Sequence, residues 1–295
     1  MKKETKSLIA ILATIVIFLL IFTRIDINSV IEELSKANLF YLAVSVIPMI
    51  FAIIIQSQRW QQILRSMGYA IPYFKCLHIL MASFPLTSVT PSKAGDVIRG
   101  YYLRKEINPT RTIGSVLTER IFDLSVLILF SSIGIIVYGR YEFLFVILMS
   151  LLILGVIILI LSLTSRFTMK KSIKDKVDNV THSMRLLLKQ KKVLLSILVS
   201  SILIWLLAIV QTLCFFYALD IEIPTIFIIG NIPIAIFIGM IPISLGGMGT
   251  RDAAIVILFS DYGTPSQLLS IGLIFSFFRY WLLAFVGIPF MKRMI

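Results

Sequence analysis

Three charged residues lie close together within an otherwise apolar stretch, residues 113–138. Glu119 and Asp123 are four positions apart, so a helix would place both on one face, and Arg120 is close enough along it to pair with Asp123. A charge at the bilayer centre costs ~2.5–3.5 kcal/mol on insertion scales, so it is seldom incidental. Two interpretations remain open: a self-neutralising structural cluster, or an anion site in which Arg120 binds phosphate as a planar fork and the acids orient it.

A second group combines glycines with charge. Gly246, Gly247 and Gly249 come directly before Arg251 and Asp252, and an apolar run follows. Bare backbone N–H groups at the start of a helix attract anions, so this pattern predicts a phosphate cradle. The run lacks the Gly-Lys-Ser/Thr of a nucleotide-binding loop, so nucleotide hydrolysis is not indicated.

Arg279 stands alone near the middle of another apolar stretch, residues 267–290, and Asp252 is our first candidate for its partner. Lys93, Asp96 and Arg99 precede the first cluster and have two interpretations. They either gather lipid headgroups or form an ordinary basic flank on the cytoplasmic side. The full candidate substrate-binding set is Lys93, Asp96, Arg99, Glu119, Arg120, Asp123, Gly246, Gly247, Gly249, Arg251, Asp252 and Arg279.

Metal and cofactor chemistry is not indicated. The cysteines, Cys76 and Cys214, form no CxxC pair, and neither His78 nor His182 has a second ligand nearby in the sequence. We therefore predict no catalytic residue, no metal site and no cofactor.

The composition places these charges in a membrane. The 295 residues are 58% hydrophobic and only 15% charged, whereas a soluble domain is typically ~45–50% apolar and ~25% charged. This contrast excludes an ordinary soluble enzyme, a disordered chain and a disulfide scaffold, and predicts an all-α polytopic membrane protein. Basic loops on the cytoplasmic side explain the net charge of +13, so we predict no nucleic-acid partner.

We predict about six full spans, with both termini in the cytoplasm and the plasma membrane as the location. Residues 27–38 read as a linker outside the membrane. Residues 166–192 hold nine Lys/Arg against two Asp and mark the cytoplasmic side, as an orientation loop or interfacial helix, or as a site for lipid headgroups or a partner. The predicted spans are residues 7–23, 39–55, 113–138, 143–165, 193–218 and 267–290.

Two further apolar segments are interrupted by proline and glycine, residues 73–91 and 223–250. Each is followed by a glycine-plus-acid corner and then by a span with buried charge, so the chain reads as two repeat-like halves, residues 73–138 and 223–290. The flanking charges start the first segment inside and the second outside, which predicts two re-entrant segments in an inverted-topology repeat. Interrupted segments at matching positions of two halves point to the substrate site of a transporter.

At this point the chain resembles a known family, the lysylphosphatidylglycerol synthase transmembrane region, also called the flippase-like domain family. The similarity covers nearly the whole chain. Arg59-Trp60 fits the pattern of the family's second span. Residues 91–99 and 118–123 resemble the pattern P-x-(K/R)-x-G-(D/E)-x-x-R … E-R-x-x-D. Residues 242–252 resemble P-x-x-x-G-G-x-G-x-R-E, with Asp252 where glutamate is common.

The resemblance implies a single flippase-like domain, residues 1–295, without the aminoacyltransferase domain of the bifunctional members. It implies lipid handling, and stand-alone members resemble partners of polyprenyl-phosphate pathways. Our leading hypothesis is a non-enzymatic translocase that moves an anionic or polyprenyl-phosphate-linked lipid by alternating access. The alternatives are a membrane-embedded transferase and a non-catalytic partner of a lipid-modifying enzyme.

Overall fold

The computed structural model describes residues 3–139, 141, 144–145, 148, 151–152, 155, 178–179, 184–241 and 243–294. Every regular element among these residues is helical, as the composition predicts. The predicted span at residues 143–165 and most of the basic loop at residues 166–192 lie outside the described residues.

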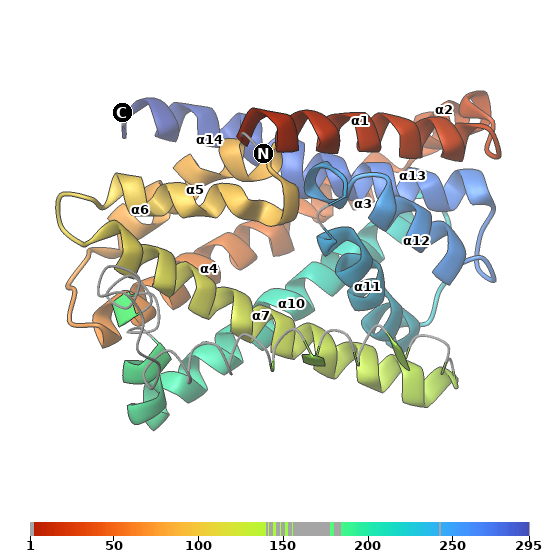
Figure 1. The fold of residues 1–295 in the computed structure, drawn as a ribbon. Coiled ribbons are helices and arrows are strands. Elements are labelled where there is room, and N and C mark those ends of the chain that lie inside the picture. The colour runs from red at the N-terminus through yellow and green to blue at the C-terminus, as the bar shows by residue number, and fades with distance from the viewer. Residues whose placement is uncertain are drawn as a thin grey trace.

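Within the described ranges, four helical stretches are long and apolar enough to cross a membrane. They are Leu39–Ser66 (α3, Leu39–Val44, and α4, Val46–Ser66), α7 (Pro109–Tyr138), α10 (Lys191–Ala218) and Pro265–Lys292. The last comprises α13 (Pro265–Ser276), the π-helical turn η4 (Phe277–Trp281) and α14 (Leu282–Lys292). The fold is therefore that of a multi-pass α-helical membrane protein (Figure 1).

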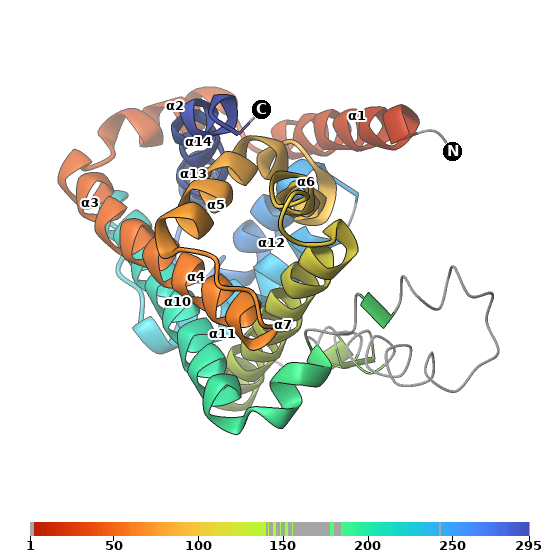
Figure 2. The same cartoon turned by 90° about the vertical axis from the view of Figure 1, so that its left-hand side faces the viewer.

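The N-terminal region forms two helices, α1 (Lys3–Phe22) and α2 (Ile27–Lys36), bent by 93° and countable as a fifth span. Asp26 starts α2 by accepting a hydrogen bond from the Ser29 N–H at 3.0 Å. The predicted linker is thus a helix, which packs against α13. Figure 2 shows α1 projecting from the rest of the helices.

Two half-length helices correspond to the predicted broken segments. Both α5 (Tyr73–Ser88) and α11 (Thr225–Met240) have 16 residues, about 24 Å, which is short of a ~30 Å hydrocarbon core. Pro85 and Pro233 lie inside these helices without ending them. The chain leaves the helix at Thr90 and Ile241, each extended and each directly before a proline, a position where helical conformation is disfavoured.

Each half-length helix leads into a 3₁₀ turn and a short helix. The first series is η1 (Pro91–Val97) and α6 (Ile98–Tyr102), and the second is η3 (Leu245–Gly247) and α12 (Thr250–Leu258). The two 3₁₀ turns pack against each other. This junction is where the chemistry-bearing residues of the two halves come together.

The helix pairs that pack most extensively are α4 with α10, α5 with α14, and α11 with α7. The largest apolar core lies between α7, α10, α11, α12 and α13 and is rich in phenylalanine. The α7–α11 contact is close because Gly134 faces Gly230: a Cβ built on Gly230 would lie 2.2 Å from the Gly134 Cα. Backbone atoms cannot give way there as a flexible side chain can.

We therefore expect Gly230→Ala to destabilise the protein by about 1–3 kcal/mol, the usual cost of overpacking. The measurement is thermal unfolding of the purified protein in detergent. Gly263→Ala is the matched control, because its added methyl would meet only ordinary contacts at 3.4 Å. Equal melting temperatures for the two variants would contradict a tight α7–α11 contact.

Candidate functional site

Six charged side chains form a closed ring of ion pairs at the junction of α4, η1, α6 and α7. Acids and arginines alternate around it, so three positive and three negative charges cancel. In order, the members are Arg59, Glu119, Arg99, Asp96, Arg120 and Asp123. The ring joins α7 to η1 and α6, which precede it directly, and to α4, which lies far from it in the sequence.

Arg59 of α4 links this helix to both α7 and α10. Its side chain is 1% exposed, and its Nη1 donates to Asp123 Oδ1 at 2.6 Å and to Ser201 Oγ of α10 at 2.7 Å. Its Nη2 lies 3.5 Å from Glu119 Oε1. The helical spacing of Glu119 and Asp123 along α7 is what lets one guanidinium reach both carboxylates.

The opposite side of the ring contains Arg99 and Arg120. Arg99 Nη1 donates to Glu119 Oε2 at 2.7 Å, and its Nη2 donates to Asp96 Oδ1 at 3.2 Å. Arg120 pairs with Asp96 and, at 3.4 Å, with Asp123 Oδ2. Its side chain is 23% exposed, so Arg120 is the ring member best placed to exchange a carboxylate for a ligand.

The turn η1 holds Asp96 in place by close backbone packing. Thr87 Oγ1, near the end of α5, donates to Asp96 Oδ1 at 2.9 Å. A Cβ on the neighbouring Gly95 would lie 2.4 Å from the Leu86 carbonyl carbon, so only glycine lets η1 approach α5 this closely.

The second charged pair is Arg251 with Asp252 at the start of α12. Arg251 Nη2 donates to Asp252 Oδ1 at 2.8 Å, and its guanidinium lies over the Phe275 ring at 4.4 Å. Asp252 Oδ2 accepts from the Gly249 N–H at 2.9 Å, which caps α12. Among the described residues Arg251 Nη1 has no hydrogen-bond partner.

This arrangement changes the interpretation of the glycine run as a phosphate cradle. The Gly249 N–H is already bound by Asp252, and a Cβ on Gly247 would lie 2.5 Å from the Gly239 carbonyl oxygen. Gly246 does line a cavity. Gly247 therefore lets η3 lie against α11, and all three glycines have the positive φ that favours glycine.

Arg279 lies midway along the Pro265–Lys292 span, in the π-helical turn η4. A π turn shifts the side chains of a helix relative to its regular register and leaves carbonyls free, and it often marks a functional site. Here Ser88 Oγ of α5 donates to the Tyr280 carbonyl at 2.8 Å. Arg279 Nη1 donates to Gln211 Oε1 of α10 at 3.2 Å.

The expected Arg279–Asp252 pair is therefore wrong, because Asp252 pairs with Arg251 and Arg279 bonds to a neutral amide. Within the described part of the chain, Arg279 is not in an ion pair. Its hydrogen-bond partner is the neutral Gln211 amide, whereas Asp123 makes ion pairs with Arg59 and Arg120.

The three arginines face a common cavity with two lobes. The first lobe, about 660 Å³ of space free of atoms including its open mouth, is lined on its polar side by Arg120, Asp123, Arg251 and Arg279. Its apolar side includes Leu124, Leu127, Trp205, Ile236 and Met240. The second lobe, about 630 Å³, shares Arg120, Arg279 and Tyr280 with the first.

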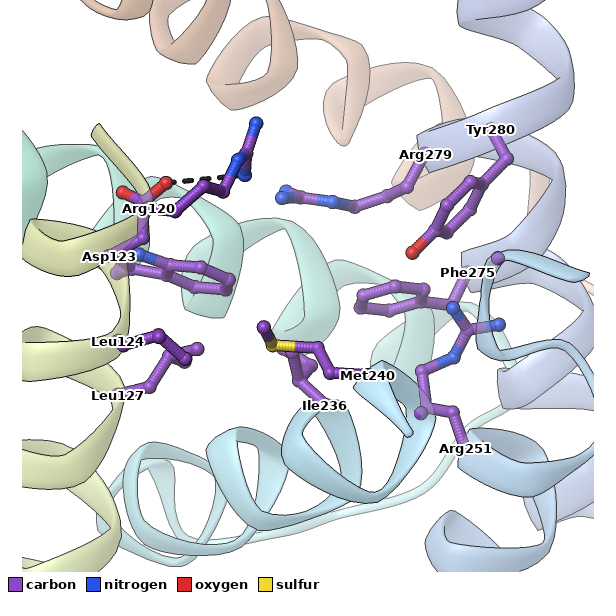
Figure 3. Close-up of a pocket in the computed structure, with 13 residues that line it drawn as sticks. Arg120, Asp123, Leu124, Leu127, Ile236, Met240, Arg251, Phe275, Arg279 and Tyr280 are labelled. Carbon is purple, nitrogen blue, oxygen red and sulfur yellow. Dashed lines mark hydrogen bonds and ion pairs between the residues drawn. The ribbon is translucent and has the colours of Figure 1, made fainter. Parts of the chain in front are cut away.

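Figure 3 shows Arg120 and Arg279 pointing toward each other across the cavity, with Arg251 beside Phe275. The cavity is thus a charged compartment with an apolar wall, inside a bundle of membrane-spanning helices. Two buried donor atoms of its lining, Trp205 Nε1 and Arg251 Nη1, have no acceptor among the described residues. An occupant with acceptor oxygens would satisfy them.

The sequence places Asp96 and Arg99 in a set separate from the Glu119–Asp123 cluster, and other residues of the site were not predicted. Asp96, Arg99, Glu119, Arg120 and Asp123 do come together, whereas Lys93 falls in η1 with its side chain outside the described residues. Arg59, Ser201 and Gln211 were missed. Arg59 is a cation near the end of an apolar segment, and this position could have indicated a site residue. The same position is equally typical of a basic residue that marks the cytoplasmic end of a span.

The fold and the cavity define a class: a multi-pass helical membrane protein with a charged cavity between its spans. The chain belongs to the family described as "Lysylphosphatidylglycerol synthase TM region", whose profile matches residues 7–287. A similar relative is the UPF0104 membrane protein MJ1595 of Methanocaldococcus jannaschii, 23% identical over 89% of this chain and 87% of the relative. Another is a UPF0104 membrane protein of Methanothermobacter thermautotrophicus, 24% identical over 87% and 86%.

Proposed function

We propose that the protein is a translocase that moves a lipid with an anionic headgroup, either a phospholipid or a polyprenyl-phosphate-linked lipid, across the plasma membrane. The headgroup binds in the two-lobed cavity. The observation that carries this proposal is Arg279, a half-buried arginine at mid-span that faces the cavity and bonds to the neutral Gln211. A cation at mid-span without an ion-pair partner is costly, and an anionic ligand reduces that cost.

The charge balance of the site supports an anion as the occupant. The ring is neutral, and Arg251 is balanced by Asp252. Arg279 adds one positive charge that no carboxylate of the described residues offsets in an ion pair. A phosphate oxygen between Arg120 and Arg279 would also give acceptors to the donor groups of the lining.

The shape of the cavity supports an amphiphile. Part of the cavity lining is charged and part is apolar, and the apolar part includes Leu124, Leu127 and Met240. A free inorganic anion would leave that apolar part in contact with water. A lipid headgroup with its first hydrocarbon groups fits both parts.

The packing of the helices supports two halves related by inverted topology. Helix α5 of the first half packs on α14 of the second, and α11 of the second packs on α7 of the first. A twofold relation between residues 73–138 and 223–290 predicts this reciprocal pair of contacts between the halves. Helices α4 and α10 also pack on each other. Substrate sites of such transporters lie at the repeat interface near the midplane.

Alternating access would then be a rocking of one half against the other around the cavity. The ring offers a way to couple the motion to the ligand, since Arg120 pairs with Asp96 and Asp123 when no anion is bound. An anion that takes one of these positions weakens the link between η1 and α7. Both termini lie in the cytoplasm in this scheme, as the basic flanks indicate.

The proposal is tested in proteoliposomes. We expect fluorescent phosphatidylglycerol or a polyprenyl-phosphate lipid, each initially in one leaflet, to become accessible to a membrane-impermeant quencher in the presence of the protein. A neutral glycolipid should move no faster than in protein-free vesicles, because it cannot neutralise Arg279. Equal rates for the anionic and neutral lipids would contradict an anion site, and no movement of either anionic lipid would contradict translocation.

The transferase alternative receives less support from the geometry. A transferase needs a carboxylate that can hold a metal or act as a base. In the ring, Asp96, Glu119 and Asp123 each accept from two arginines. A partner role in a lipid-modifying complex would leave activity intact after substitution of the cavity arginines.

A further inference from the structure

We infer that the hydrocarbon chain of the transported lipid lies in a seam between α3–α4 and α13–η4–α14, continuous with the headgroup cavity. This inference rests on the proposed function and adds the second half of the ligand site to it. We call the apolar part of this seam the chain groove. It is lined by Leu34, Leu39, Leu42, Ala43, Val46, Leu273, Ile274, Phe277 and Phe278.

The chain groove is made entirely of apolar side chains and holds about 980 Å³ of space including its open side. Its residues on the first long span, Leu39, Leu42, Ala43 and Val46, follow the three- and four-residue spacing of one helical face. Several of them are well exposed, with Leu39 76% accessible. In the membrane this surface contacts hydrocarbon.

The second cavity lobe continues the same seam one turn further along both helices. On α4 its lining residues are Met49, Ala52, Ile53 and Gln56, which extend the stripe that begins at Leu39. From Leu39 to Gln56 the stripe is about 25 Å long at the helical rise. Its lining changes from wholly apolar at α3 to polar at Gln56.

The facing helix shows the same change at the π turn. Phe277 and Phe278 line the chain groove, and the next two residues, Arg279 and Tyr280, line the headgroup lobe. The π turn η4 therefore carries the boundary between the apolar and the charged parts of the seam. Figure 1 shows α3 and α13 in the same part of the molecule.

The order of the lining residues along the seam favours one occupant of the chain groove, because Val46 and Phe278 of the groove are followed by Met49 and Arg279 of the headgroup lobe. A second copy of the chain or a partner helix would require only an apolar surface, and would not explain a lining that grades into Arg120 and Arg279. An anionic lipid matches this lining, because it has a charged headgroup at one end and an apolar chain along the rest of its length. With its headgroup at mid-span, its chain would extend along the groove toward α2 and α3, parallel to the spans.

The experiment uses the full chain in nanodiscs with phosphatidylglycerol that carries a diazirine in one acyl chain. After irradiation, mass spectrometry identifies the labelled peptides. We expect label on peptides that contain Val46 and Phe277, and Ala43→Trp to remove it by filling the groove. Leu203→Trp, on a bilayer-facing position of α10 (44% exposed), should leave the labelling unchanged.

Label spread evenly over the bilayer-facing helices, or unchanged by Ala43→Trp in a folded protein, would overturn the inference. So would disulfide-linked dimers of an Ala43→Cys variant, which would place a second copy in the groove. The assay does not require transport. Seam labelling without lipid movement would reject the proposed translocation alone, and movement without seam labelling would reject the chain groove alone.

Discussion

Replacement of Arg59 by methionine is expected to destabilise the protein by about 3–5 kcal/mol, the usual cost of removing one partner of a buried ion pair. Its guanidinium is 1% exposed and bonds to Asp123, Glu119 and Ser201. Without it the ring keeps three carboxylates but only two arginines, and one negative charge stays buried. Unfolding in detergent, followed by circular dichroism against denaturant or temperature, measures the loss.

Two control variants separate ring charge from side-chain size. Arg65→Met changes the same residue type on the same helix at an exposed position, so it should alter stability little. Arg59→Met combined with Asp123→Leu restores neutrality and should recover part of the loss. If the Arg59 and Arg65 variants unfold alike, the ring does not contribute to stability as its burial indicates.

The fold class could be predicted from the sequence, because apolar runs long enough to span a bilayer are rarely compatible with a soluble fold. It also indicated the α7 cluster, since Glu119 and Asp123 lie one helical turn apart. Arg59 could not be assigned to that cluster, because its partners lie 60 and 64 residues away and only packing brings α4 beside α7. Long-range pairs of this kind leave no periodic signal.

The breaks in the two half-length helices show a similar limit. Pro85 and Pro233 read as breaks, yet both lie inside helices, since neighbouring groups in a packed membrane protein can compensate the lost hydrogen bond. The chain leaves the helix before Pro91 and Pro242, which the sequence also contains. Local composition predicts that a break exists, while the contacts around each proline decide where it falls.

The partners of Arg251 and Arg279 could not be predicted for the same reason. Gly-Gly-x-Gly-Thr-Arg-Asp looks like an anion site in sequence, but its aspartate caps α12 and pairs with Arg251. Arg279 has no motif around it, and it lies on the cavity only because η4 and Gln211 hold it there. The less conspicuous arginine is therefore the stronger candidate for headgroup binding.

Arg279→Gln should separate ligand binding from stability. We expect the affinity for an anionic lipid headgroup to fall about 10- to 100-fold, because a hydrogen bond to a charged group contributes ~1.5–3 kcal/mol. Transport of anionic lipid should fall with it. Stability should hold or rise, because the variant removes a half-buried charge at mid-span whose hydrogen bond among the described residues is to the neutral Gln211.

Three further variants serve as comparisons for this prediction. Arg251→Gln should instead lose stability, because Asp252 then keeps only the Gly249 N–H among its described partners. Arg279→Lys keeps the charge without the planar fork and should bind with intermediate affinity. Arg24→Gln, at an exposed position between α1 and α2, should bind and transport normally. Lipid-binding titrations and melting temperatures of the four variants measure both quantities together, and full affinity in Arg279→Gln would remove the cavity arginine from the headgroup site.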